Sequence, residues 1–176
     1  MKKLAIIAVL ASLLCGCASM KPVLPEKVRK IAIPTFANRT SQYDLETGFT
    51  NSVIKQFMVD GRLEVVSRDK ADVLLEGTIR QYLLQPMLYD VNNVIVQYKL
   101  KIVLDLKFTD LATGKISWEQ KELGGITGGT TTYNVSGGSA NIATARIETE
   151  NEARQRIFNN MAVACLNRVI YGWENY

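Results

Sequence analysis

The residue types that most often perform catalysis are scarce in this chain. Its 176 residues include no histidine, which excludes imidazole acid–base steps, Ser-His-Asp and Cys-His nucleophiles, and His-ligated metal sites. Several carboxylates stand singly at expected turns rather than in pairs: Asp69, Asp72, Asp105 and Asp110. The glycine pairs within residues 124–129 lack the Gly-Lys-Ser/Thr sequence of a phosphate-binding loop. We therefore expect no enzyme, and no cofactor or metal site.

Two cysteines near the N-terminus indicate export and lipid attachment. The basic start Met1–Lys3 and the apolar residues 4–14 are typical of a secretory signal, because a membrane-spanning helix needs ~20 residues. The segment Leu14–Cys17 resembles the bacterial lipobox, in which a cysteine is lipidated and becomes the first mature residue. We predict a lipoprotein signal peptide at residues 1–16 and a lipid, palmitate included, on Cys17. An ordinary signal peptide with two incidental cysteines is the alternative.

Loss of the signal peptide changes what charge and cysteine content imply. The whole chain carries a net charge of +4, but without Lys2 and Lys3 it has 19 basic and 17 acidic residues. Since no dense basic run remains, we expect no nucleic-acid partner. Cys165 is then the free thiol, and its apolar helical register predicts that it is buried. By the sorting rules of enteric-type bacteria, Ala18 in place of aspartate favours the outer membrane.

The periodicity of apolar residues predicts a single α/β domain at residues 28–176, preceded by a lipidated tether at residues 17–27. Apolar stripes at i, i+4 spacing predict two amphipathic helices, and alternation or short apolar runs predict five strands. The strands are expected at 28–33, 63–67, 73–84, 96–109 and 116–123, and the helices at 45–60 and 150–171. The order βαββββα favours an α+β two-layer sandwich, in which both helices cover one face of a mixed four- to five-stranded sheet.

Both helices carry terminal signals in the sequence. Asp44 is expected to cap the first helix, and Gly61 is expected to end it. At the start of the second helix, Thr149 and Glu152 fit a capping box.

The strand at residues 96–109 is the clearest single element, because apolar and polar residues alternate along it. At ~3.3 Å per residue, about 14 residues extend roughly 45 Å, whereas ordinary strands are ~17–20 Å long. We therefore expect part of this hairpin to project beyond the domain or to bend strongly. Lys99, Lys101 and Lys107 share the polar face. They form either an ordinary solvated surface with edge-protecting lysines or a basic stripe for an anionic partner.

The turn between the third and fourth strands is unusually apolar. Its hydrophobic residues are Leu84, Met87, Leu88, Tyr89, Val91 and Val94. A solvent-exposed turn rarely carries so many, so they either fold back onto the core or dock into a partner or a lipid. We take Met87, Leu88, Tyr89 and Val91 as candidate partner contacts.

Three motifs carry a resemblance to a known family. They are Lys-Ile-Ala-Ile-Pro-Thr-Phe-Ala-Asn-Arg-Thr at 30–40, Leu-Glu-Thr-Gly-Phe-Thr-Asn-Ser-Val at 45–53, and Ala-Asp-Val-Leu-Leu-Glu-Gly-Thr-Ile at 71–79. Together with the lipobox and the late helix, their order and spacing resemble the lipopolysaccharide (LPS)-assembly lipoproteins of the LptE family. The resemblance covers about residues 30–173, and the chain is similar to a divergent branch without a long C-terminal extension.

The resemblance implies a lipid-anchored protein on the periplasmic side of the outer membrane. Members of this family plug the lumen of the LPS-translocating β-barrel LptD and assist its assembly. They bind LPS during its insertion into the outer leaflet, and no enzymatic step is known for them. A polar sheet face would suit the polar lumen of such a barrel.

The resemblance also implies basic LPS-contacting residues, at the hairpin and before the last helix. The hairpin turn 85–94 contains no Lys or Arg, and the flanking residues Arg80 and Lys99 are the nearest basic ones. Arg146 precedes the last helix. We therefore name Arg80, Lys99 and Arg146 as the candidate LPS-binding residues.

Two sibling groups of outer-membrane lipoproteins begin with a similar strand and amphipathic helix. These are the curli-secretion lipoproteins and the activators of penicillin-binding proteins, which assemble a pore or contact a periplasmic synthase. The long hairpin without a further helix, after the Ala71–Asp72 motif, favours the LPS-assembly function. A carboxylate enzyme is the third alternative, and it would need a pair of perturbed acids that the sequence does not contain.

Overall fold

The computed structural model describes residues 24–25, 27–123, 129–135 and 146–172, and every structural statement below concerns these residues. Cys17, the tether up to residue 23, and most of the Gly/Thr/Ser-rich stretch lie outside them. The described elements follow the order β1 (Lys30–Ala32), β2 (Ala37–Asn38), α2 (Leu45–Asp60), β3 (Glu64–Val65), a 3-10 turn η1 (Arg68–Lys70), β4 (Val73–Tyr89), β5 (Ile95–Asp110), β6 (Ile116–Leu123), β7 (Thr130–Asn134) and α3 (Glu150–Tyr171).

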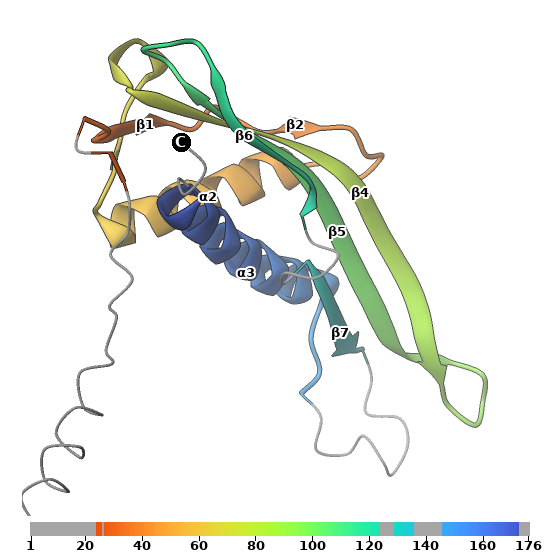
Figure 1. Cartoon of the computed structure of the whole chain (residues 1–176). Helices are drawn as coiled ribbons and strands as arrows, with labels where there is room; N and C mark the ends of the chain where they lie inside the picture. Colours follow the sequence, from red (N-terminus) through yellow and green to blue (C-terminus); the bar gives the residue numbers. More distant parts are fainter. Residues whose placement is uncertain (1–23, 26, 124–128, 136–145, 173–176) are drawn as a thin grey trace, which may run out of the picture.

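One mixed, curled sheet organises the fold, and both helices lie on one side of it (Figure 1). Its main order is β3-β1-β4-β5-β6, while β2 pairs with β4 and β7 pairs with β5. β1 pairs parallel with β3 and β4, and β2 pairs parallel with β4. β4, β6 and β7 all pair antiparallel with β5. This confirms the predicted α+β sandwich with two helices on one face.

The sheet has seven strands among the described residues, more than the expected four to five. The two additional strands are β2 and β7. β2 is only two residues long, which is too short for any alternation to be visible in the sequence. β7 lies in a Thr-rich stretch that composition assigns to a loop, yet its Tyr133 ring stacks on Tyr98 of β5 at 5.8 Å between centroids. Pairing with β5, rather than local propensity, therefore makes this segment a strand.

The hydrophobic core lies between the helices and the sheet. Phe49 of α2 contacts Phe36 and Phe158 of α3, with ring centroids 5.2 and 5.4 Å apart. The core-facing side chains of β5 are fully buried, as the alternation predicts: Leu100, Ile102, Leu104, Leu106 and Phe108. Cys165 is also fully buried, which confirms that prediction, and burial raises the pKa of its thiol to about 12.

An aromatic–cationic stack joins the C-terminal part of α3 to β6. The Trp118 ring lies on Phe108 with 5.2 Å between centroids, and the Arg168 guanidinium sits 5.1 Å from the centre of the Trp118 ring. The Trp118 indole Nε1 is buried without a hydrogen-bond partner among the described groups. The contact is therefore held by packing and by cation–π attraction.

The helix termini confirm two of the three predicted signals. Gly61 ends α2 in the left-handed conformation, at φ 72°, and Thr149 forms a complete capping box with Glu152. The prediction for Asp44 is wrong, because its side chain makes no capping hydrogen bond. An N-cap side chain reaches the helix N–H groups from extended backbone, as at Thr149, whereas Asp44 has a left-handed backbone with φ 59°.

Candidate partner-binding surface

The β4–β5 hairpin projects beyond the helices that cover the rest of the sheet (Figure 1). The two strands pair from Val73 opposite Asp110 to Tyr89 opposite Ile95. Along β4 the side chains are largely buried up to Ile79 and exposed from Leu83 to Tyr89. The register shifts near Ile79 and again near Pro86, so the hairpin is also bent by bulges.

The apolar side chains at the end of the hairpin are exposed. Val91 is 94% exposed, and Met87, Leu88 and Tyr89 are 46–53% exposed. They therefore do not fold back onto the core. Single exposed hydrophobic residues are ordinary, but a contiguous group of this kind is typical of an interaction site.

Hydrogen bonds fix the turn that presents these side chains. The Asp90 carboxylate accepts hydrogen bonds from the backbone N–H groups of Asn92 and Val94, both at 2.8 Å. The Asp90 N–H donates to the Val94 carbonyl, also at 2.8 Å, and Asn93 adopts φ 63°. Asn is one of the few residues other than Gly that tolerate this conformation. The apolar group thus sits on an ordered turn.

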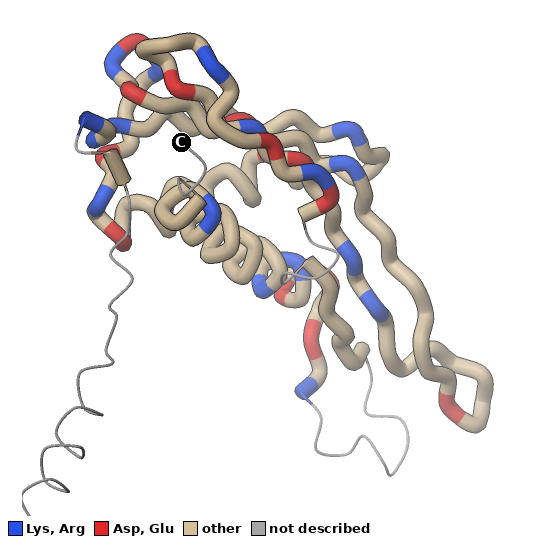
Figure 2. The backbone as a smooth tube through the Cα atoms, in the orientation of Figure 1, with Lys and Arg blue, Asp and Glu red and all other residues tan. Residues whose placement is uncertain are grey.

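The end of the hairpin is nearly uncharged, whereas the sheet behind it is basic. Between residues 81 and 98 the one charged side chain is Asp90, as the tube in Figure 2 shows. Lys99 and Lys101 follow on the polar face of β5, and neither forms an ion pair with a described residue. Lys107 is neutralised by Glu76 at 2.6 Å. A basic stripe, which is one of the two interpretations of these lysines, is therefore confined to the part of β5 nearest the tip.

The three candidate LPS residues do not form one site. Arg80 pairs with Asp105 at 3.2 Å on the outer face of the sheet. Lys99 lies on the same face but at least four residues farther along β5, roughly 15 Å away. Arg146 pairs with Glu152 at 3.4 Å beside the start of α3, on the helix side. The structure places Arg80 and Lys99 along one face and separates Arg146 from both.

A basic group that sequence reasoning missed surrounds Arg80. Arg39, Arg80 and Lys121 line a hollow of about 480 Å³ together with the acids Asp105 and Glu122. Arg39 follows β2, and its backbone N–H donates to the Ile79 carbonyl at 2.9 Å. The three cations come from three separate segments, so no local motif in the sequence could have indicated the group.

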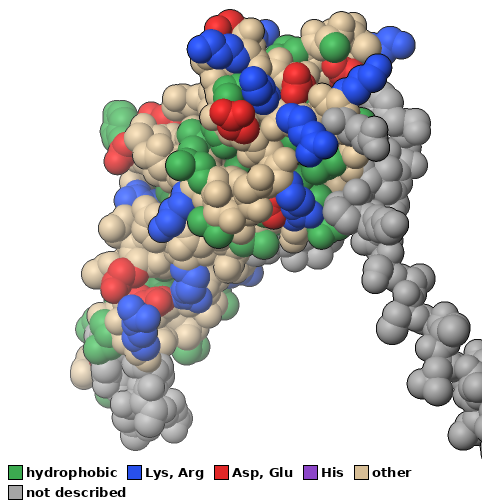
Figure 3. Space-filling view, turned by 90° about the vertical axis from the view of Figure 1, so that its left-hand side faces the viewer, with side chains coloured by type: hydrophobic (Ala, Val, Ile, Leu, Met, Phe, Trp, Pro, Cys, Tyr) green, Lys and Arg blue, Asp and Glu red, His purple; other side chains and the backbone are tan. Residues whose placement is uncertain are grey.

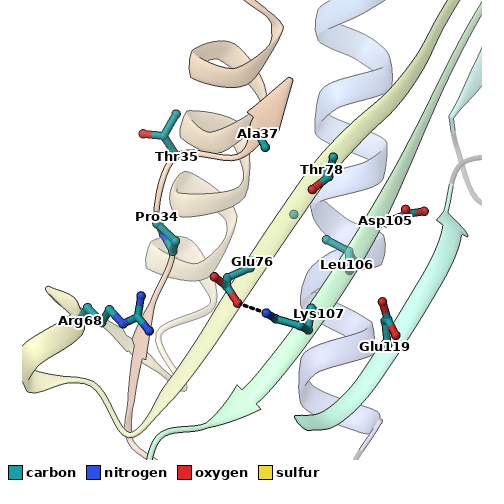
Figure 4. Close-up of a pocket in the computed structure, with 11 residues that line it drawn as sticks. Pro34, Thr35, Ala37, Arg68, Glu76, Thr78, Asp105, Leu106, Lys107 and Glu119 are labelled. Carbon is teal, nitrogen blue, oxygen red and sulfur yellow. Dashed lines mark ion pairs between the residues drawn. The ribbon is translucent and has the colours of Figure 1, made fainter. Parts of the chain in front are cut away.

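A second hollow on the outer face, of about 410 Å³, shows no catalytic arrangement (Figure 4). Glu76 and Lys107 pair across it, while Arg68 and Glu119 lie on opposite sides. Charges of both signs are also interspersed on the face drawn in Figure 3. No cluster of three or more metal-ligating side chains occurs in the described part of the chain.

Three of the four isolated carboxylates have structural partners. Asp72 accepts the backbone N–H groups of Arg29 and Lys30, at 2.9 and 2.8 Å, and so holds the start of β1. Asp110 accepts the N–H of Ala112 at 2.8 Å, within the β5–β6 turn. Asp105 accepts the N–H of Glu122 at 3.0 Å. None of these acids is paired with another acid as general acid–base catalysis would require.

Comparison with solved structures places the fold among known ones. A neuraminyllactose-binding hemagglutinin homolog from Helicobacter pylori matches with a TM-score of 0.52 and 10% identity, over 86% of this chain and 88% of that chain. A DUF330 protein from Xanthomonas campestris matches with a TM-score of 0.51 and 12% identity, over 88% and 92%. A hypothetical protein from Chlamydia trachomatis also gives 0.51, with 9% identity, over 82% and 99%. At these identities the likeness concerns the fold alone.

The family comparison is more specific. No curated protein matches the sequence. No helix in the described part of the chain has the length and hydrophobicity that a membrane-spanning helix needs. The family model "LptE: Lipopolysaccharide-assembly" matches residues 28–169, which is most of the chain and nearly all of the folded domain. The resemblance drawn from three short motifs is thereby confirmed, and this chain belongs to the LptE family of lipopolysaccharide-assembly proteins.

Proposed function

We propose that this chain is an outer-membrane lipoprotein, anchored on the periplasmic side through lipidated Cys17, that assists assembly of the β-barrel LptD and plugs its lumen. It binds LPS while the barrel inserts it into the outer leaflet, and it performs no catalytic step. Family membership supports this function. The observation that carries it is the exposed apolar end of the hairpin, held on an ordered turn whose one charged side chain is Asp90.

The apolar tip and the polar sheet face are stabilised by different surroundings. Apolar area left in water costs roughly 25 cal/mol per Å², so the tip gains by burial against another protein. The outer sheet face is polar and charged, as Gln97, Lys99 and Lys101 show, and the lumen of a large barrel is polar as well. An apolar tip with a polar sheet behind it therefore fits a plug whose tip is buried against the barrel and whose sheet faces the polar lumen.

The basic residues supply the proposed LPS contact. Lipopolysaccharide carries phosphate groups, which Arg and Lys side chains bind through charge-assisted hydrogen bonds. Arg80, with Arg39 and Lys121 beside it, and Lys99 face outward from the same side of the sheet. We assign Arg80 and Lys99 to one surface and treat Arg146 as a separate contact.

The first test replaces the tip side chains. Changing Met87, Leu88, Tyr89 and Val91 to Ser should lower LptD recovered from detergent-solubilised outer membrane at least tenfold. The melting temperature should stay the same, because these side chains are exposed. The matched control changes Tyr43, Met58 and Val59 to Ser, since they are also exposed hydrophobics but lie on α2 and before it. Recovery of a synthase or a homo-oligomeric ring by the unmodified protein would contradict the proposed function.

The second test concerns LPS. Changing Arg80, Lys99 and Arg146 together to Ala should weaken binding of purified LPS, and unchanged binding would remove these residues from the proposal. The control changes three exposed lysines that form no ion pair with a described residue: Lys55, Lys70 and Lys115. It removes the same charge from other parts of the surface, so a general electrostatic effect would show in both variants.

A further inference from the structure

Strand β4 has a free edge along the projecting part of the hairpin. One edge pairs with β5 throughout, and the other pairs with β1 at Val73–Leu74 and with β2 at Thr78–Ile79. From Arg80 to Tyr89, no segment that the structure describes pairs with this second edge. A row of unpaired backbone groups is a template for another strand.

Pairing on the far side of β5 shows which backbone groups point to the free edge. The Ile102 N–H donates to the Gly129 carbonyl at 2.7 Å, and the Val96 carbonyl accepts from the Val135 N–H at 3.0 Å. Even-numbered residues of β5 in this stretch therefore direct their backbone groups toward β7 and away from β4. Their partners across the hairpin must likewise point away from β5. These partners are Tyr82, Leu84 and Pro86.

The free edge thus offers two N–H groups, from Tyr82 and Leu84, and the carbonyls of all three residues. Pro86 has no N–H, and proline is found in sheets at edge positions of this kind. Two copies of the chain pairing antiparallel about Leu84 would each place Pro86 opposite the partner's Tyr82 and leave a carbonyl without a donor. This arrangement disfavours a second copy, whereas a different strand can end before Pro86.

The side chains flanking the edge define the chemistry of the strand that fits. On the helix side, the Tyr82 hydroxyl donates a hydrogen bond to the Glu150 carboxylate of α3, and Leu84 lies opposite buried Leu100. On the outer side, Leu83 lies opposite Lys101 and Gln85 opposite Lys99, and both lysines lack ion-pair partners among described residues. An added strand would be separated from β5 by β4 and would lie about 10 Å from the backbone of the two lysines. Its outward side chains would contact Leu83 and Gln85 directly, and only a long acidic side chain such as glutamate could reach the lysine ammonium groups. A complementary strand would therefore alternate apolar residues on the helix side with long acidic residues on the outer side.

We propose that the free edge of β4 from Tyr82 to Pro86 binds an extended segment of the barrel partner as an additional strand, with alternating apolar and acidic side chains. The inference rests on the proposed function for the identity of the partner. It adds the mode of contact, in which backbone hydrogen bonds supply affinity and the two lysines fix which face of the strand turns outward.

The first experiment removes one N–H from the edge. Leu84→Pro deletes a group that points away from β5, so the hairpin ladder keeps its bonds. Leu84→Ala is the matched control, because it shortens the side chain but retains the N–H. In affinity purification of the full lipoprotein from detergent-solubilised outer membrane, Leu84→Pro should recover about tenfold less LptD than Leu84→Ala. Equal recovery by two variants with equal melting temperatures would overturn the inference.

The second experiment maps the contact without relying on proline. A photo-reactive amino acid is placed in turn at positions 83 and 85 in cells, and cross-linked peptides are identified by mass spectrometry. An added strand predicts one LptD segment, with cross-linked positions advancing about two residues for each two-residue step along β4. Scattered LptD positions, or cross-links to a second copy of this chain, would overturn the inference.

The two proposals fail in different ways. If LptD co-purifies but no cross-link forms at these positions, the edge inference is wrong and the proposed function stands. If LptD is neither recovered nor cross-linked, both are wrong.

Discussion

At the scale of single residues, the Asp72 carboxylate holds two parts of the backbone together. Its carboxylate accepts two consecutive backbone N–H groups, from Arg29 and Lys30, and its own N–H donates to the Lys30 carbonyl at 3.0 Å. Its carbonyl accepts from the Leu111 N–H at 2.9 Å. Asp72 therefore ties β1 to the turn after β5, at the point where the chain begins its sheet.

We expect Asp72→Ala to destabilise the protein by about 1–3 kcal/mol, because it leaves two backbone donors of β1 without an acceptor. Asp69→Ala is the control, since Asp69 is exposed in η1 and has no hydrogen bond to a described residue. Its effect should remain within about 0.5 kcal/mol. Urea unfolding of both variants measures the difference, and equal midpoints would contradict the structural assignment of Asp72.

The Cys165 thiol gives a prediction about pH. Burial raises its pKa from the ordinary 9.0 to about 12. Between these values the folded chain keeps the thiol proton and the unfolded chain loses it. The free energy of unfolding should therefore fall as the pH rises above about 9, by up to about 1.4 kcal/mol per pH unit from this group.

Urea unfolding between pH 7 and 10.5 measures this dependence. Other groups titrate in the same range, so the control is Cys165→Ala, which lacks the thiol and retains everything else. The wild type should lose stability more steeply than this variant. Parallel pH profiles would show that the thiol is not buried.

At the scale of elements, the two helix starts differ in how they are held. Thr149→Ala should cost about 1 kcal/mol, because it removes the side-chain acceptor for the Glu152 N–H. Asp44→Gly should cost nothing or stabilise slightly, since Asp44 makes no capping bond and glycine adopts its left-handed φ freely. Thermal unfolding of both variants measures this contrast. A larger loss at Asp44 than at Thr149 would contradict it.

The elements that the sequence predicted best are those whose own periodicity defines them. Both helices and β6 have the expected bounds, because their apolar spacing and end signals coincide. β7 was missed, since its Thr-rich composition is equally suited to a loop and only β5 makes it a strand. β1 and β3 are shorter than their apolar runs, because each parallel pairing of β1 extends over only two residue pairs.

Part of the candidate site was predictable, because that part is also defined by a local pattern in the sequence. The apolar tip was visible as a local cluster, and its exposure confirms that the hairpin projects. The grouping of Arg39, Arg80 and Lys121 was not visible, because a bulge at Ile79 and the passage of β2 bring them together. The free edge of β4 was also hidden, since an edge is a property of sheet order and not of any one strand.

At the scale of the whole molecule, the sheet has one part that holds the core and one part that projects beyond it. The half of the sheet under α2 and α3 holds the core, from Phe49 and Phe158 to Phe108. The projecting half of β4 contributes little to that core, so its sequence is free to serve a partner. Substitutions there should change binding without changing stability. The experiments on the tip side chains and on Leu84 both depend on this difference.

The stack of Arg168 on Trp118 allows the contact between α3 and the sheet to be followed by tryptophan fluorescence. An indole held between a benzene ring and a guanidinium, away from water, emits at shorter wavelength than one in solution. Any event that separates α3 from β6 should move that emission toward the red, while changes confined to the hairpin tip should leave it unaltered. The chain contains one other tryptophan, Trp173, so Trp173→Phe isolates the signal of Trp118. Fluorescence of that variant, recorded as LptD is added, would report whether the sandwich stays closed when the hairpin is engaged.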